Sequence, residues 1–352
     1  MLKIYAITDD SWYPKYSMDR FRQHATEISF VTSPEDANLI WHYSYYVPDS
    51  SLSETYFRPL NKLLGIKERK KRKLRSTPIV GSVHHLVPEK KRVWQASIKR
   101  LNTRADFIHY FSESNLRKDR ENFSKPVIVA PYWIDLQMFR PINPELRRQI
   151  KARLGLPTDC YILGSFQRDT EADGKSPKLE KGPDIFADVI ERLDYNKIFV
   201  LLAGPRRGYL EQRLKRANIE YRSLGQVAYN SMPELYGAID CYLVTSRMEG
   251  GPQAILECMA TMTPIYSTSV GIANLLEPDA IMHTTDGFIR ALKNVYPDLL
   301  ERHLEKIRHY GCERVVPYYE NLFSKIISSF LDDQADQRFA LTEFPRYEKY
   351  RP

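Results

Sequence analysis

Two carboxylates, two glycines and a proline stand close together in one stretch, Glu-Gly-Gly-Pro-Gln-Ala-Ile-Leu-Glu, directly after an apolar segment. Gly250 and Gly251 let the backbone turn tightly, and Pro252 suits the first turn of a helix whose free N–H groups would attract an anion. Carboxylates beside a phosphate are unfavourable unless they accept hydrogen bonds from hydroxyl groups, which a ribose and a hexose offer. The stretch therefore predicts a sugar-nucleotide site that Glu249 and Glu257 flank at different depths.

Two cations lie earlier in the chain. Arg168 follows the apolar segment Tyr161–Phe166, and Lys181 begins the next helical segment after a polar excursion. An arginine and a lysine at the end of a strand can neutralise a diphosphate leaving group as charge develops on it. Either residue alone is more simply a surface cation, but their occurrence together with the glutamate motif favours a shared anion site.

Short β-like segments alternate with helical ones along most of the chain, which is typical of parallel sheets covered by helices. In the first half the predicted strands are Lys3–Ile7, Ile28–Val31, Asn38–Tyr43, Pro78–His84, Phe107–Phe111 and Val127–Ala130. In the second half they are Tyr161–Phe166, Ile198–Ala203, Tyr221–Leu224, Cys241–Val244, Pro264–Tyr266 and Ile281–His283. We expect an α/β protein with two Rossmann-like, doubly wound domains.

The segment Pro131–Pro144 carries three prolines and loses both periodicities, so we expect it to join the domains. The N-terminal, acceptor-side domain is placed at residues 1–136 and the donor-binding domain at 137–310. Residues 311–352 should form a helix and a polar tail that pack back toward the N-terminal domain. A central cleft between two such domains would be suited to a phosphorylated ligand and a second substrate.

Composition and missing motifs exclude several classes. The 352 residues are 43% hydrophobic and 27% charged, and no apolar run approaches the roughly 20 residues that cross a bilayer. The segment Thr8–Pro14, after the first strand, contains no glycine, which disfavours a nicotinamide or flavin enzyme. The four cysteines lack close pair spacing, which disfavours a zinc site or a disulfide framework and fits a reducing cytoplasm.

The formal net charge of +8 is concentrated in the run Lys62–Arg75, where eight basic residues stand against Glu68 alone. The run is either a solvated helix end and loop or a patch for anionic lipid headgroups, an anionic acceptor or nucleic acid phosphates. Because the basic residues do not recur with interleaved aromatics, we do not expect nucleic acid as a partner. We expect a cytoplasmic protein that contacts the inner face of the membrane through this run.

These motifs resemble the retaining nucleotide-sugar glycosyltransferases of family 4, which have the two-domain GT-B fold. The motifs that carry the resemblance are Glu249-x7-Glu257, Thr263–Gly271, Arg168 with Lys181-Gly182, and Pro131–Pro141, where Tyr132-Trp133 replace the family's usual Asn-Gly. The resemblance extends over most of the chain. It implies transfer of a hexosyl unit, with retention of configuration, from a nucleotide-diphosphate sugar to a glycan, lipid-linked or other hydroxyl acceptor.

The resemblance also implies roles for single residues. Arg168 and Lys181 would bind the donor diphosphate. Glu257 would take the ribose hydroxyls, and Glu249 would contact the transferred sugar. Further donor contacts are implied for the amides of Gly250 and Gly251, for Lys178 as an extra phosphate ligand, and for the base-holding strand end Gly225, Gln226 and Val227.

On the acceptor side the resemblance implies a catalytic histidine near the reacting carbon of the donor sugar. His84 and His85 both end a predicted strand, whose alternation sends them to opposite sides, so only one can face the ligand; we favour His85. Ser112-Glu113 resembles the family's serine-glutamate turn, although Ser112 can equally cap a helix. His42 either lines the acceptor pocket or packs with neighbouring tyrosines.

The sequence has no Asp-x-Asp motif at a strand end, since its nearest acidic pairs are Asp9-Asp10 and Asp332-Asp333. We therefore expect transfer without a metal or cofactor, with Arg168, Lys181 and a helix dipole in the role of the ion. Two alternatives from other classes stay open. One is a nucleic-acid-binding or nucleic-acid-modifying protein, and the other is a scaffold that binds a sugar nucleotide without catalysis.

Overall fold

The structure is a computed structural model that describes residues 1–8, 12–43, 77–87, 91–193, 197–294 and 297–331. The chain divides into unit 1, which comprises Met1–Trp133 and the chain from Cys312, and unit 2, Ile134–Gly311; the predicted boundaries were 136 and 310. Among the described residues, every helix is too short or too polar to cross a bilayer. The basic run Lys62–Arg75 and both acidic pairs lie outside them.

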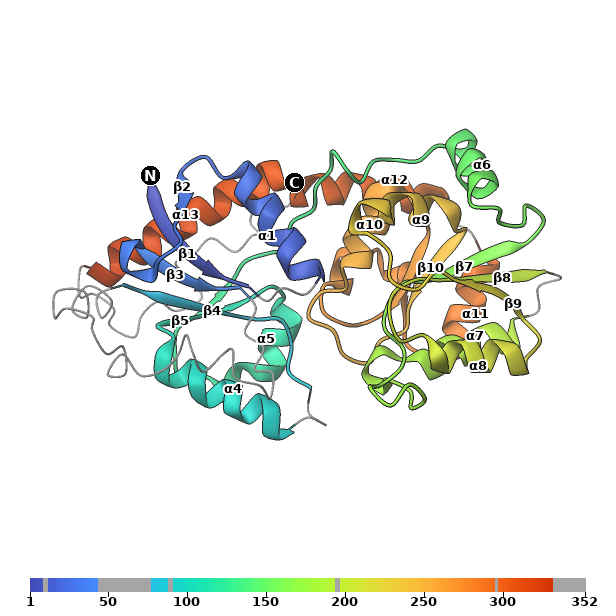
Figure 1. Cartoon of the computed structure of the whole chain (residues 1–352), viewed down its shortest axis with the longest axis horizontal. Helices are drawn as coiled ribbons and strands as arrows, with labels where there is room; N and C mark the ends of the chain where they lie inside the picture. The colour runs from blue at the N-terminus through green and yellow to red at the C-terminus, as the bar shows by residue number, and fades with distance from the viewer. Residues whose placement is uncertain (9–11, 44–76, 88–90, 194–196, 295–296, 332–352) are drawn as a thin grey trace. The chain divides into compact units, whose positions relative to one another are not determined.

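Unit 1 is built on a parallel sheet of six strands in the order β2-β1-β3-β4-β5-β6. In chain order these are β1 (Leu2–Ile7), β2 (Ile28–Phe30), β3 (Leu39–His42), β4 (Ile79–Val83), β5 (Phe107–Tyr110) and β6 (Val127–Val129). Its described helices are α1 (Trp12–His24), α4 (Lys91–Arg104), α5 (Glu113–Asp119) and α13 (Cys312–Leu331), with 3-10 turns η1 (Pro34–Asp36) and η4 (Arg120–Asn122). Figure 1 shows α1 and α13 over one face of the sheet and α4 and α5 over the other.

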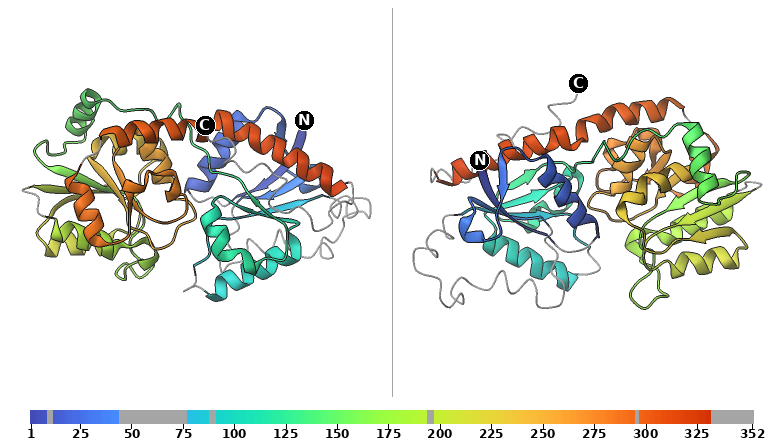
Figure 2. Two further views of the ribbon diagram at one scale, coloured as in Figure 1. Left: turned by 180° about the vertical axis from the view of Figure 1, so that it is seen from behind. Right: turned by 45° about the horizontal axis from the view of Figure 1, so that its top comes forward.

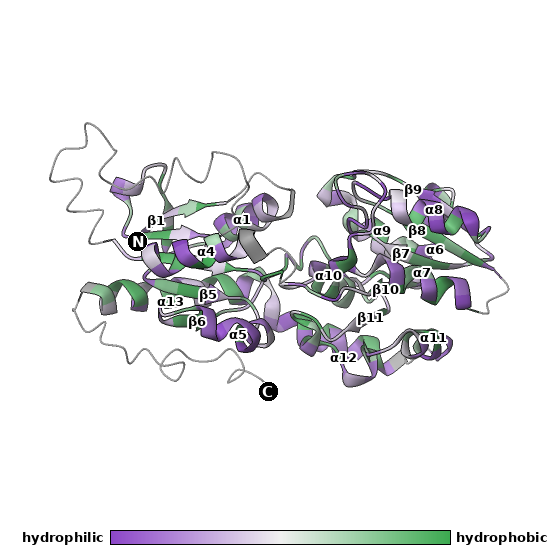
Figure 3. Ribbon diagram, turned by 90° about the horizontal axis from the view of Figure 1, so that it is seen from below, coloured by the Kyte–Doolittle hydropathy of each residue, from purple (hydrophilic) through white to green (hydrophobic). Residues whose placement is uncertain are grey.

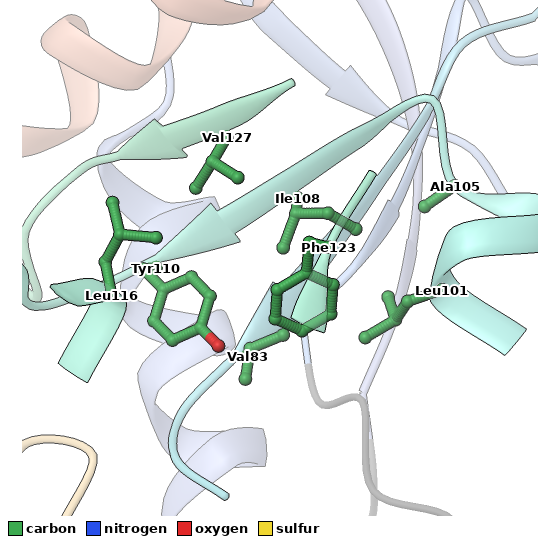
Figure 4. Packing of buried hydrophobic residues seen from close by; sticks show 8 residues of the cluster. All are labelled: Val83, Leu101, Ala105, Ile108, Tyr110, Leu116, Phe123 and Val127. Carbon is green, nitrogen blue, oxygen red and sulfur yellow. The ribbon is translucent and has the colours of Figure 1, made fainter. Parts of the chain in front are cut away.

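One face of this sheet packs a hydrophobic core against α4 and α5. Figure 4 shows the cluster, in which Leu101 of α4 and Ala105, directly after α4, lie beside strand residues such as Ile108. The other members are Val83, Tyr110, Leu116, Phe123 and Val127. Burial of such side chains is the main favourable term in folding, which is why strands covered on both faces are apolar.

The opposite face carries an aromatic layer that α1 and α13 cover. Trp41 of β3 lies 5.3 Å from Phe21 of α1 and 4.9 Å from Phe323 of α13, measured between ring centroids. Tyr319 of α13 lies 5.4 Å from Trp133. Both views of Figure 2 show α13 beside α1, so the C-terminal helix completes the core of the N-terminal sheet.

A carboxylate fastens the same helix to the chain after α1. Glu320 of α13 is buried, and its Oε1 accepts hydrogen bonds from the amides of Thr26 and Glu27 at 2.7 and 2.6 Å. Hydrogen bonds to a charged group stabilise more than neutral ones, so this contact holds α13 in register against unit 1.

A buried polar chain crosses the same layer. The Trp41 indole donates to Ser82 Oγ at 2.9 Å, and Ser82 Oγ lies 2.8 Å from Nδ1 of His109. Nε2 of His109 lies 3.1 Å from both the Ala130 carbonyl and the Tyr319 hydroxyl. Burial lowers the pKa of His109 to about 3, so the imidazole is neutral in the folded protein.

We expect His109→Gln to weaken the acid sensitivity of unit 1. Below pH 6.5 the histidine is protonated in the unfolded chain, whereas in the folded protein His109 stays neutral down to about pH 3. The free energy of unfolding therefore falls as the pH falls through this range. The unfolding free energy of wild type should drop between pH 7 and pH 5 by about 2 kcal/mol more than that of the variant. Urea titrations followed by tryptophan fluorescence measure this, since all four tryptophans belong to unit 1.

His303→Gln provides the control for that prediction. Burial also lowers the pKa of His303, to about 4, but this residue belongs to unit 2. The fluorescence-monitored transition of this variant should keep the pH dependence of wild type. An unchanged pH dependence in His109→Gln would show that His109 is not the group responsible.

Unit 2 contains a second parallel sheet of six strands, in the order β12-β11-β10-β7-β8-β9. These are β7 (Tyr161–Ser165), β8 (Ile198–Leu202), β9 (Glu220–Ser223), β10 (Cys241–Val244), β11 (Ile265–Thr268) and β12 (Ile281–Met282). Its helices are α6 (Pro144–Arg153), α7 (Pro183–Arg192), α8 (Gly208–Arg216), α9 (Met232–Ala238), α10 (Gln253–Thr261), α11 (Thr285–Lys293) and α12 (Pro297–Ile307). The 3-10 turns are η5 (Leu179–Lys181), η6 (Tyr229–Ser231), η7 (Ala273–Leu275), η8 (Pro278–Ala280) and η9 (Arg308–Tyr310).

The helices of unit 2 form two layers. Figure 1 shows α9, α10 and α12 over one face of the sheet and α7, α8 and α11 over the other. In Figure 3 the interior strand β8 is coloured hydrophobic, whereas α8 is largely hydrophilic, as a helix that borders solvent should be. The prediction of two doubly wound, parallel α/β sheets is confirmed.

The predicted strand ends differ slightly from those observed. β4 ends at Val83, the last residue of its ladder with β5, so His84 lies after the strand and not within it. Cys241, Cys258 and Cys312 are buried, as expected for small core residues, whereas Cys160 is half-buried.

Candidate functional site

The predicted cation and carboxylate of unit 2 meet directly. Lys181 Nζ lies 2.7 Å from Glu249 Oε1, and Ser246 Oγ donates to the same oxygen at 2.9 Å. Glu249 is buried, whereas the Lys181 side chain is 20% exposed. The turn before α7 and the loop after β10 thus bring a positive group into contact with a buried negative one.

Gly182 determines where Lys181 lies. It adopts a left-handed conformation with φ +61°, and its carbonyl accepts a hydrogen bond from Thr245 Oγ1 at 2.8 Å. A Cβ atom at this position would lie 1.8 Å from the Thr245 carbonyl oxygen. Only glycine fits so close to the end of β10, and α7 begins at the next residue, Pro183.

The loop that carries Glu249 is held from its other side by the end of β11 and the segment after it. Thr268 Oγ1 donates to the Ser246 carbonyl at 2.5 Å. A Cβ atom on Gly271 would lie 2.9 Å from the Gly250 carbonyl oxygen. The loop runs into α10, which begins at Gln253. Pro252 was predicted in the first turn of this helix, but it is the capping residue directly before it.

Glu257 lies deeper, on the buried side of α10. Its Oε1 accepts a hydrogen bond from the Tyr229 hydroxyl, and its Oε2 accepts one from Tyr236 at 2.5 Å. Burial raises the pKa of Glu257 to about 7. Phe139, from the segment that joins the units, packs against both tyrosine rings at 5.7 and 6.4 Å. Tyr229 lies two residues after Gly225–Val227, so its hydrogen bond to Glu257 brings the chain near this segment to α10.

Arg168 lies three residues after the end of β7. Its side chain is exposed and makes no hydrogen bond or ion pair with other described residues. Its neighbour Gln167 donates from Nε2 to the Lys181 carbonyl at 3.1 Å, which joins the Arg168 segment to the Lys181 turn. Lys178, predicted as an extra phosphate ligand, pairs with Glu180 at 2.6 Å and with Glu171 at 3.9 Å.

The candidate residues of unit 1 are engaged in packing. Nδ1 of His84 lies 2.6 Å from the Tyr132 hydroxyl, its Nε2 lies 3.0 Å from the Tyr43 carbonyl, and its ring stacks on Phe111 at 4.7 Å. His85 follows it and is half-buried. These contacts give His84 a structural position, which agrees with the preference for His85 but does not test it.

The remaining acceptor-side candidates are spread over two elements. His42 of β3 is buried, and burial lowers its pKa to about 3. Ser112 precedes α5 without a capping hydrogen bond from its side chain, and its Oγ lies 2.8 Å from Ser114 Oγ. Glu113 pairs with Arg117 at 3.1 Å. In the described ranges no group of three or more His, Cys, Asp or Glu side chains is placed to hold a metal ion.

Comparison with known proteins finds a match to a family model in part of unit 2. Residues 174–304 match the family model for glycosyl transferases group 1. The matched region contains Lys181, Glu249 and Glu257 and omits Arg168. It begins inside the loop between β7 and α7 and ends in α12, so it covers most of the candidate site.

Two curated relatives of the glycosyl transferases group 1 region are named for bacterial glycan synthesis. The chain is 30% identical over 155 residues to the lipopolysaccharide core biosynthesis mannosyltransferase LpsB of Rhizobium meliloti (42% of this chain, 41% of the relative). It is 31% identical over 147 residues to the putative teichuronic acid biosynthesis glycosyltransferase TuaC of Bacillus subtilis (41% of this chain, 33% of the relative). The chain spans less than half the length of these relatives.

Solved structures match the fold across both units. HepE of Anabaena, in complex with UDP and glucose, matches with a TM-score of 0.69 at 14% identity over 94% of this chain and 100% of its own. Sucrose-phosphate synthase of Thermosynechococcus elongatus matches with a TM-score of 0.67 at 16% identity over 94% of this chain and 100% of its own. The predicted fold class, two Rossmann-like domains of the GT-B type, is therefore confirmed.

Sequence reasoning missed the tyrosines that hold Glu257 and the serine that holds Glu249. Tyr229 and Tyr236 belong to no motif and reach Glu257 only through the packing of η6 and α9 on α10. Ser246 lies between the buried strand β10 and the Glu-Gly-Gly motif. This position could have identified it as a polar residue of the site. Its hydroxyl shares the Glu249 carboxylate with Lys181.

Proposed function

We propose that this protein is a glycosyltransferase that moves a hexosyl unit from a nucleotide-diphosphate sugar to a hydroxyl acceptor, with retention of configuration and without a metal ion. The observation that carries the proposal is the Lys181–Glu249 pair at the strand edge, inside the region that matches glycosyl transferases group 1. A donor complex of a structural neighbour, UDP with glucose, supports the donor class. The names of the curated relatives support a glycan or lipid-linked acceptor.

In this mechanism the bond between the anomeric carbon and the departing phosphate oxygen breaks, and its electron pair stays with the diphosphate. Lys181 and Arg168 stabilise the developing charge, which is the usual role of fixed cations in phosphate departure. The acceptor oxygen bonds to the same face of the sugar. Its proton passes to the departing phosphate oxygen, and Glu249 accepts hydrogen bonds from hydroxyls of the transferred sugar.

The experiment that tests the function has two stages. The melting temperature is measured with uridine, guanosine and adenosine diphosphates, because a ligand that binds only the folded protein raises it. Hydrolysis and transfer are then measured with sugar conjugates of the nucleotide that binds, with and without excess chelator. We expect turnover in chelator. Binding without turnover would favour the scaffold alternative, and loss of turnover that a divalent ion restores would contradict metal-independent transfer.

Donor affinity should depend on the ionisation of Glu257. Ribose hydroxyls would donate hydrogen bonds to the ionised carboxylate. Burial raises the pKa of Glu257 to about 7, so this side chain is protonated at acid pH, and the donor must then displace the proton in order to bind. Titration of wild type with the intact sugar nucleotide should give a dissociation constant about 30-fold higher at pH 5.5 than at pH 8.

Glu257→Gln is the matched control for this pH dependence. The amide keeps the shape of the side chain and cannot titrate, so the variant should bind the donor weakly and equally at both pH values. A flat profile in wild type would remove Glu257 from the donor site.

A further inference from the structure

A buried arginine, Arg207, touches both ends of the segment that carries Arg168. It lies in the loop between β8 and α8, and its side chain is 2% exposed. Its Nη2 donates to the Ser165 carbonyl at 3.0 Å and to Ser165 Oγ at 2.8 Å, and its Nε lies 3.1 Å from Asp169 Oδ2. Ser165 ends β7 and Asp169 directly follows Arg168, so one guanidinium group holds the chain before and after that residue.

Backbone hydrogen bonds join the same two loops. The amides of Asp169 and Thr170 both donate to the Arg206 carbonyl, at 3.3 and 3.1 Å. Arg206 adopts a left-handed conformation with φ +59°, which is unfavourable for a residue with a Cβ atom. Thr170 Oγ1 accepts from the Tyr209 amide at 2.8 Å, at the start of α8. The Arg168 segment is therefore fixed by the loop after β8 and not by its own side chain.

The burial of this ion pair argues for a geometric role. An arginine and an aspartate that are both 2% exposed lose their hydration, and such pairs contribute little net stability. Nη1 of Arg207 has no hydrogen-bond partner among the described residues and no contact with solvent. A group so enclosed cannot touch a ligand, and its effect must pass through the residues that it holds.

We propose that Arg207, together with Asp169, is a positioning residue that fixes the Arg168 guanidinium where the donor diphosphate binds. The inference rests on the proposed function. It predicts that loss of Arg207 weakens the contact that Arg168 makes and leaves the other donor contacts intact. A nucleoside diphosphate should therefore lose affinity, and the corresponding nucleoside monophosphate should not.

A double-mutant cycle tests the proposal. Dissociation constants for the nucleoside diphosphate that binds best, and for its monophosphate, are measured by calorimetry on wild type, Arg207→Met, Arg168→Ala and the double variant. We expect Arg207→Met to weaken diphosphate binding about tenfold and monophosphate binding less than twofold. In the Arg168→Ala background it should have no further effect. Equal losses for both nucleotides, or additive losses in the double variant, would overturn the proposal.

Two further variants separate positioning from folding. Arg213→Met removes ion pairs from α8 to Asp188 and Glu191, at 2.9 and 2.7 Å, and should leave diphosphate affinity unchanged. Ser165→Ala removes one hydrogen bond of Arg207 with little effect on the fold, and should weaken diphosphate binding about threefold even if Arg207→Met does not fold. No effect of Ser165→Ala would count against the proposal. If wild type binds no nucleoside diphosphate, the proposed function fails and this inference with it.

Discussion

Lys181→Ala should lower the turnover of sugar transfer by about 10² or more, because the ammonium group stabilises charge that develops on the leaving diphosphate. The structure adds a second reason. Lys181 neutralises the buried Glu249 carboxylate at 2.7 Å, and without it that carboxylate would stand unpaired beside an incoming diphosphate. We therefore expect weaker donor binding in addition to slower transfer. Steady-state and single-turnover kinetics separate the two effects.

Two comparisons make this result specific. Lys175→Ala removes a positive charge from an exposed position in the same loop between β7 and α7, and it should leave turnover unchanged. Lys181→Ala combined with Glu249→Gln removes both charges, so donor affinity should recover in part while turnover stays low. Wild-type turnover in Lys181→Ala would show that the leaving group is stabilised elsewhere.

Gly182→Ala should destabilise unit 2 by about 3 kcal/mol or more and abolish transfer. A residue with a Cβ atom costs roughly 1–2 kcal/mol in the left-handed conformation that Gly182 adopts. In addition, the new methyl group would overlap the Thr245 carbonyl oxygen at 1.8 Å and push η5 away from β10. Urea unfolding followed by circular dichroism gives the change in stability.

Gly174→Ala isolates the steric part of that loss. Gly174 is also left-handed, with φ +74°, but a Cβ atom there would meet nothing within 4 Å. Gly174→Ala should cost only the conformational part, roughly 1–2 kcal/mol. Equal losses in the two variants would mean that the contact with Thr245 relaxes without strain.

The apolar runs and the polar segments between them predicted the strands of both sheets, because strands covered on two faces are apolar runs bounded by polar loops. The Glu-Gly-Gly-Pro motif and the Arg168 and Lys181 positions were predicted for a similar reason. The motif and Arg168 each follow a strand within a few residues, and Lys181 stands just before the next helix, α7. The carboxyl ends of parallel strands and the starts of the helices that follow them lie along one edge of a sheet. Sequence order alone then brings Lys181 and Glu249 to the same edge.

What the sequence could not predict depends on packing between distant elements. Nothing in the pattern around Tyr229 predicts that its hydroxyl holds Glu257, and the enclosure of Arg207 by Ser165 and Asp169 is equally hidden. The unusual Trp133 in the joining segment also becomes understandable only in three dimensions. Its ring fills the aromatic layer under α13, and its indole donates to the Ser17 carbonyl at 3.0 Å.

The discontinuity of unit 1 has a consequence for biosynthesis. Its sheet is translated first, but α13 leaves the ribosome only after the whole of unit 2 has been made, a delay on the order of ten seconds or more. During that interval Tyr319 and Phe323 do not yet cover Trp41, so the nascent chain presents an open aromatic surface. Unit 2, whose sequence is continuous, can finish folding earlier. The first sheet to be synthesised is thus the last to close.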